Sequence, residues 1–110
     1  MNGITLVLRA LHHGERKLEK DLLRAVRERA TSALTPRVAE PLTLLRDLRR
    51  IYLAASANSL GWEMLAQVAQ ATKNSELLDL ASSCHPQTLR QIRWANTMIK
   101  TLSPQLLASV

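Results

Sequence analysis

The chain of 110 residues contains no phenylalanine and is poor in glycine and proline, the residues that most often mark turns. It has two tryptophans, one tyrosine, three glycines and four prolines. A sheet protein of this length needs turn signals about every 8–12 residues, which so few glycines and prolines do not supply. These absences argue against a sheet protein. They favour long helices around a core of leucine, isoleucine, valine and alanine.

Cysteine and long apolar runs are also scarce. The single cysteine, Cys84, cannot form an internal disulfide, and this is typical of a reducing compartment. It lies on an apolar face, so we expect it to pack in the core although His85 is adjacent. No apolar run reaches the length of a membrane span, and Met1–Leu11 has no signal-peptide pattern. We therefore predict a soluble, cytoplasmic protein with one domain over residues 1–110.

The charge is basic, with 15 lysines and arginines against 9 acids and a formal net charge of +6. Basic side chains form two stripes at helical spacing: Arg46, Arg49 and Arg50, then Arg90, Arg93 and Lys100. Elsewhere acids and bases alternate along the predicted helices, as on a solvated surface. Because no recognition helix, zinc spacing or aromatic platform accompanies the stripes, nucleic-acid binding is kept only as an alternative.

Hydrophobic periodicity predicts three helices, over about residues 4–30, 39–73 and 75–102, followed by a flexible tail over 103–110. The second helix is expected to begin near Pro41, which suits a first turn. Asn74 or Ser75 is predicted to cap the third helix. Pro86 interrupts that helix and predicts a kink or a break at residues 82–85.

This pattern predicts an all-α protein, an up-down bundle of three long antiparallel helices whose third helix is kinked or split at Pro86. Four packed helices bury their apolar seams more completely than three. Moreover, residues 51–57 are apolar nearly all round the second helix. We therefore expect a homodimer to complete the bundle.

One position in the first predicted helix is chemically unusual. Its apolar seam alternates steps of four and three and consists of Ile4, Leu8, Leu11, Glu15, Leu18, Leu22 and Ala25. A carboxylate at the position of Glu15 must be paired, hydrogen-bonded, protonated or bound to a metal, because burying an unpaired charge is costly. Gly14 is the one poor helix former, and it allows a neighbouring helix to approach closely.

Carboxylates and imidazoles that project into a bundle can form di-iron or di-manganese sites. The candidate metal ligands share a face of the first helix or lie on the other two: His12, Glu15, Glu19, Glu63 and His85. No Glu-x-x-His motif occurs, so we assign no metal or other cofactor and keep iron or manganese as the alternative. Trp62 and Trp94 are expected to be core or interface anchors. Trp94 falls off the main seam and is the better candidate for a dimer contact.

Several segments resemble small bacterial ferritin-like bundle proteins of uncharacterised role: 11–18, 62–71, 76–78, 84–88, 91–94, 99–100 and 104–107. This resemblance implies a helical bundle with an inward glutamate, Glu15, on its first helix. The family's second helix is replaced by the linker Thr31–Arg37, and its Glu-x-x-His motifs are missing. Only Glu15 and Glu63 occupy ligand positions, so the resemblance implies a shortened, metal-free relative.

The leading functional hypothesis is therefore a non-enzymatic helical scaffold that binds itself or another protein. The first alternative is a carboxylate-bridged iron or manganese protein of ferritin-like type. The second is weak nucleic-acid binding through the arginine stripes. The sequence identifies no catalytic residues and predicts neither a membrane anchor nor a specific partner.

Overall fold

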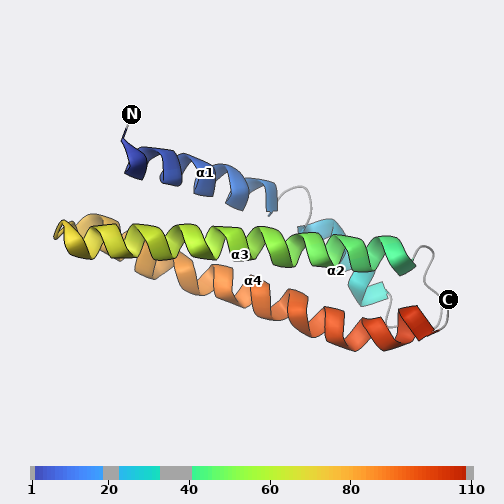
Figure 1. The fold of residues 1–110 in the computed structure, drawn as a ribbon. Coiled ribbons are helices and arrows are strands. Elements are labelled where there is room, and N and C mark those ends of the chain that lie inside the picture. Colours follow the sequence, from blue (N-terminus) through green and yellow to red (C-terminus); the bar gives the residue numbers. More distant parts are fainter. Residues whose placement is uncertain (1, 19–22, 33–40, 109–110) are drawn as a thin grey trace.

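The computed structural model describes residues 2–18, 23–32 and 41–108 and contains four helices (Figure 1). They are α1 (Gly3–Lys17), α2 (Arg24–Ser32), α3 (Pro41–Ala71) and α4 (Ser75–Ala108). The long helices α3 and α4 lie side by side, and α1 and α2 follow one another along α3. The molecule measures 53 × 21 × 17 Å. The predicted all-α class is confirmed.

The first predicted helix, over residues 4–30, corresponds to two helices, α1 and α2; residues 19–22 between them lie outside the described residues, so an unbroken helix there stays a prediction. Leu18 and Leu23 have wider, π-type turns, and both are buried. The step between these two core leucines is therefore five residues. A regular seam would continue through Ala25, but the structure buries Val26 and leaves Ala25 exposed.

This shift of register has a physical reason. The regular seam continues from Ala25 to Arg29, whereas the shifted seam presents Leu23, Val26 and Ala30 to the core. Aliphatic side chains gain free energy when they leave water, and a guanidinium does not. Arg29 is thereby free to reach Asp47 on α3.

The helix ends agree with local sequence signals. Asn2 Oδ1 accepts a hydrogen bond from the Thr5 backbone N–H at 2.9 Å and caps α1. Pro41 is the first residue of α3, as predicted. Of the two predicted caps of the last helix, Asn74 and Ser75, Asn74 is the one used: its Oδ1 accepts a hydrogen bond from the Leu77 N–H at 3.1 Å. Of the predicted linker Thr31–Arg37, residues 31 and 32 belong to α2 and the remainder lies outside the described residues.

Of the two outcomes predicted at Pro86, the break is wrong and the kink stays a prediction; an end of the last helix near Leu102 is also wrong, because α4 continues to Ala108 with Pro86 and Pro104 inside it. Residues 109 and 110 of the predicted tail lie outside the described residues. The seam of α4 continues through both prolines in steps of three, four and seven: Leu77, Ala81, Cys84, Thr88, Gln91, Ala95, Leu102 and Leu106. Packing along this seam keeps the helix intact, while both proline rings are exposed to solvent. Tertiary contacts thus offset the lost backbone hydrogen bonds.

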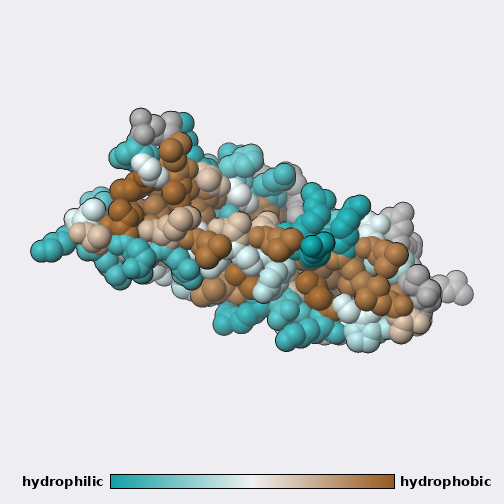
Figure 2. All heavy atoms as spheres, in the orientation of Figure 1, coloured by the Kyte–Doolittle hydropathy of each residue, from teal (hydrophilic) through white to brown (hydrophobic). Residues whose placement is uncertain are grey.

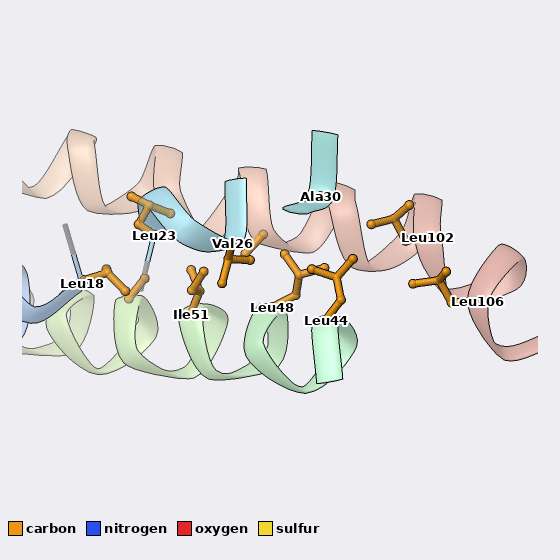
Figure 3. Close-up of a cluster of buried hydrophobic side chains, with 11 residues drawn as sticks. Leu18, Leu23, Val26, Ala30, Leu44, Leu48, Ile51, Leu102 and Leu106 are labelled. Carbon is orange, nitrogen blue, oxygen red and sulfur yellow. The ribbon is translucent and has the colours of Figure 1, made fainter. Parts of the chain in front are cut away.

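The apolar core consists of two clusters. The larger joins α2 with the first half of α3 and the second half of α4, around Leu48, Ile51 and Leu102 (Figure 3). The smaller joins α1 with the second half of α3 and the start of α4, around Leu11 and Leu65. The side chains that separate the two clusters are mostly polar.

The packing of α1 on α3 is close and antiparallel. The position of a Cβ atom at Gly14 lies 2.5 Å from Asn58 Oδ1, and the position of one at Gly61 lies 2.9 Å from the Leu11 side chain. Residue numbers therefore decrease along α1 as they increase along α3. Within the described residues, no helix has the length and apolar character required to cross a membrane.

Candidate functional site

A band of polar side chains crosses the bundle between the two apolar clusters. It comprises Glu15 from α1, Asn58 and Ser59 from α3, and His85, Thr88 and Gln91 from α4. We call these six residues the polar layer. Four of them, Asn58, Ser59, Thr88 and Gln91, are buried, with at most 7% of their surface exposed. The helices α1, α3 and α4 all contribute side chains to the layer. Contacts within the layer therefore help to fix how these three helices are placed relative to one another.

Glu15 is the centre of this layer. Its Oε1 accepts a hydrogen bond from the Thr88 hydroxyl at 2.9 Å and another from the Trp62 indole Nε1 at 3.3 Å. The two donors come from α4 and α3, so one carboxylate oxygen links three helices. Because Glu15 lies on an apolar seam, its carboxylate was predicted to need a partner, and two hydrogen-bond donors provide one. Bonds of this kind to a charged acceptor are among the stronger ones in proteins.

The layer also contains two buried polar atoms without a hydrogen-bond partner, Asn58 Nδ2 and Gln91 Oε1. Each unpaired group costs about 1–3 kcal/mol relative to a satisfied one. Asn58 is held where it is by Gly14, because its amide occupies the space of the missing Cβ atom. The predicted close approach of a helix at Gly14 is therefore confirmed.

The other predicted metal candidates do not gather around Glu15. His12 and Glu63 are exposed, and Glu19 lies outside the described residues. His85 is half-buried and shares a 2.8 Å hydrogen bond between its Nε2 atom and Ser59 Oγ. Within the part of the chain that the structure describes, no three histidine, cysteine, aspartate or glutamate side chains are arranged to hold a metal ion.

An ion-pair cluster that the sequence reasoning missed surrounds Asp47 of α3. This aspartate is 7% exposed, and its Oδ2 accepts from the Arg29 guanidinium of α2. Arg46 and Arg50 place nitrogens 3.7 Å from its other oxygen. Two of the three arginines in the first predicted basic stripe therefore face an acid. The signal was available, since Asp47 directly precedes the seam residue Leu48.

The two tryptophans have different surroundings. Trp62 is 6% exposed and packs in the smaller core cluster, one of the two placements expected for it. Trp94 is half-buried at the edge of the larger cluster, and the Arg27 guanidinium of α2 lies 5.2 Å from the centre of its ring. A dimer contact at Trp94 stays a prediction. Cys84 is half-buried against the smaller cluster.

An exposed apolar strip runs along the side of α3 that faces away from the core. It consists of Leu53, Ala57, Leu60 and Met64, which we call the α3 stripe. Its three large side chains are 53%, 59% and 57% exposed. The spacing of four, three and four residues places all four side chains on one face.

Next to the α3 stripe, Met64 also lines an apolar groove of about 490 Å³ between the start of α1 and the end of α3, together with Ile4, Val7 and Val68. Figure 2 shows apolar side chains gathered between α1 and α3 and further along the same side of the molecule.

No protein-family model, no curated protein and no solved structure matches this chain. No family match therefore supports the ferritin-like resemblance. The helical-bundle class that it implied is present in the structure.

Proposed function

We propose that this protein is a non-enzymatic helical scaffold that associates with a second copy of itself through the α3 stripe. The observation that carries this proposal is the seam spacing of Leu53, Ala57, Leu60 and Met64 on an exposed helix face. Isolated exposed leucines are common on protein surfaces, but a row at steps of four and three is typical of a helix–helix interface. The opposite face of α3 is already buried against α1, α2 and α4.

An antiparallel arrangement of two α3 helices suits the side chains of the stripe. With the twofold axis between Ala57 and Leu60, each small alanine faces a leucine of the second copy. Leu53 then faces Met64. Small against large is the pairing that allows two helices to interdigitate at a close distance.

The charges on α3 favour the same orientation. The first half of the helix carries Arg46, Arg49 and Arg50 against one acid, Asp47, and so keeps an excess of positive charge, whereas its second half carries a single charged side chain, Glu63. A parallel pair would bring the arginines of two copies together. An antiparallel pair places the arginines of one copy over the second half of α3 in the other copy, where Glu63 is the single charged side chain, and this avoids the repulsion.

The molecule also offers enough surface. Its long sides measure 53 by 21 Å and 53 by 17 Å. A stable protein–protein interface buries roughly 800 Å² on each partner, so one long side can accommodate it. In such a pair, the groove beside Met64 would receive side chains from the second copy.

Light scattering coupled to size-exclusion chromatography tests the proposal on the full chain at several concentrations. We expect the mass of a dimer for the native protein and of a monomer for a Leu60→Ser, Met64→Ser variant. The matched control is Leu89→Ser, Leu107→Ser on α4, which replaces two large side chains of 40% and 55% exposure outside the stripe. This control should remain a dimer.

Two results would oppose the proposal. If the native protein stays monomeric at about 100 μM, far above the concentration at which such interfaces normally form, the proposed self-association is refuted. If the control substitutions weaken the dimer as much as the stripe substitutions do, the interface lies elsewhere on the molecule. Circular dichroism on each variant establishes that the helices are retained.

A ferritin-like ancestry and a cytoplasmic location stay predictions, and the scaffold function requires neither. The carboxylate-bridged metal alternative gains no support from the polar layer. Glu15 Oε1 is engaged by two hydrogen-bond donors, and the exposed His12 and Glu63 do not converge on it.

A further inference from the structure

A second, chemically different recess lies between α2 and α4, in a different part of the surface from the α3 stripe. Its volume is about 550 Å³, within the range of small-ligand sites. Three arginines and one acid line it: Arg24, Arg27 and Glu28 from α2, and Arg90 from α4. We call this recess the arginine groove. Side chains from two helices thus place a formal charge of +2 around one cavity.

The wall of the groove includes an unsatisfied buried group. Gln91 lines the groove, is 4% exposed, and its Oε1 atom has no hydrogen-bond partner. A buried acceptor of this kind is stabilised when a donor reaches it. The arginines provide only donors, so the residues that line the groove include both charged donors and, in Gln91, an unpaired acceptor.

The Arg27 guanidinium has a defined position. Trp94 lies against it with 5.2 Å between the guanidinium carbon and the ring centre. An attraction between a guanidinium and an aromatic ring holds the side chain of α2 against a residue of α4. This contact ties the two helices that form the walls of the groove to each other.

We propose that the arginine groove binds the phosphate group of a small molecule. A phosphate or a phosphate monoester carries a charge between −1.5 and −2 near neutral pH, roughly that of the groove with opposite sign. Its oxygens accept from Arg24 and Arg90. In inorganic phosphate and in the protonated monoester, a P–O–H group donates to Gln91 Oε1. Sulfate has the same shape and charge but lacks that proton at neutral pH.

Isothermal titration calorimetry on the full chain at low salt tests this assignment with three probes: inorganic phosphate, glycerol 3-phosphate and sulfate. We expect saturable binding of at least one phosphate probe and weaker binding of sulfate. Tighter binding of inorganic phosphate identifies a site for the free ion. Tighter binding of glycerol 3-phosphate identifies a site for an organic monoester. Absence of binding by both phosphate probes up to 10 mM would overturn the proposal, since roughly millimolar affinity is the lower limit for a functional small-molecule site.

Variants separate the groove from general surface charge. Arg24→Gln, Arg90→Gln should weaken phosphate binding at least about tenfold, because it removes two charged donors. Arg49→Gln, Arg93→Gln removes the same charge from exposed positions outside the groove and should change the affinity less than about twofold. Equal losses in both variants would show diffuse attraction and overturn the assignment.

Two further measurements narrow the chemistry. Gln91→Leu should abolish the preference for phosphate over sulfate while both anions still bind, and an unchanged preference would refute the role of Gln91. The second measurement is binding of a single-stranded oligothymidylate. If it binds while the phosphate probes do not, and if the Arg49→Gln, Arg93→Gln variant binds it more weakly, the basic surface is a nucleic-acid site instead. Neither result depends on the dimer, because the groove and the α3 stripe share no residue.

Discussion

Replacing Gly14 by alanine is the most direct test of how α1 packs on α3. The added Cβ atom lies 2.5 Å from Asn58 Oδ1, 3.3 Å from its Cγ and 3.4 Å from its Nδ2. Ordinary contacts between such atoms are about 3.5 Å or longer. Asn58 or the whole of α1 must therefore move when the methyl group is introduced.

Two opposing free-energy terms decide the outcome. Alanine is about 1 kcal/mol better than glycine in a helix interior. Overpacking of a close-packed interior costs about 1–3 kcal/mol. Asn58 is a short side chain with 7% exposure, so it has little room to rotate away, and the cost falls in the upper part of that range. We expect Gly14→Ala to lower the free energy of unfolding by about 1–2 kcal/mol.

The assay is urea denaturation followed by circular dichroism on the native chain, Gly14→Ala, Asn58→Ala and the double variant. Because Asn58→Ala removes the atoms that the methyl group strikes, the double variant should be more stable than the two single effects predict. The coupling energy should be about 2 kcal/mol. Gly3→Ala is the control, since no atom lies within 4 Å of its added Cβ position.

One result would refute the reasoning on Gly14. If Gly14→Ala raised stability by about 1 kcal/mol, as an uncrowded helical glycine would, and showed no coupling to Asn58, then α1 would not approach α3 at this point. The shift in melting temperature gives an independent reading. For a domain of this size it is about 4–8 °C for each kcal/mol.

Four other substitutions, at three positions, test the layer, the ion pairs and α4 by the same denaturation assay. Glu15→Gln keeps an acceptor oxygen and should cost less than about 1 kcal/mol, whereas Glu15→Ala leaves two donors unpaired and should cost about 1–3 kcal/mol; equal costs would contradict the hydrogen bonds assigned here. Asp47→Asn should cost about 1 kcal/mol at low salt and clearly less in 0.5 M NaCl, since its arginine partners are largely exposed. Pro86→Ala should stabilise the protein by about 2 kcal/mol because alanine restores the N–H that the Ser82 carbonyl lacks, and a loss of stability would mean that α4 depends on the proline.

Local signals in the sequence were reliable where they depend on neighbouring residues. Pro41 starts α3 because a proline needs no donor in a first turn. Asn74 caps α4 with its own side chain. The apolar spacing of α3 predicted a long helix at nearly the correct bounds, since every step of its seam is a regular three or four residues.

The sequence was a poorer guide where tertiary packing outweighs a local preference. Pro86 predicted a kink or a break and Pro104 an end, but α4 continues as one helix past both because its buried seam continues to Leu106. Similarly, a regular period predicted Ala25 in the core. The structure buries Val26 instead, which hides more apolar surface.

The candidate sites divide in the same way. Glu15 could be identified from the sequence because a carboxylate on an apolar seam is anomalous by itself. Its partners Trp62 and Thr88 could not, since hydrogen bonds across 47 and 73 residues of chain depend on how the helices align. The arginine groove was likewise not predictable, because Arg24 and Arg90 stand near one another only after α2 and α4 have packed.

The sequence by itself therefore determined that this protein is all-helical, where α3 lies, and that one carboxylate would need a partner. Periodicity, turn residues and capping act within a few positions of the chain, so they can be recognised in the sequence alone. Only the tertiary structure decided the register shift after Leu18, the unbroken course of α4 and the two surfaces proposed here for binding. Each of these depends on which distant side chains come into contact, and the free energy of burying them exceeds the local preferences that oppose it.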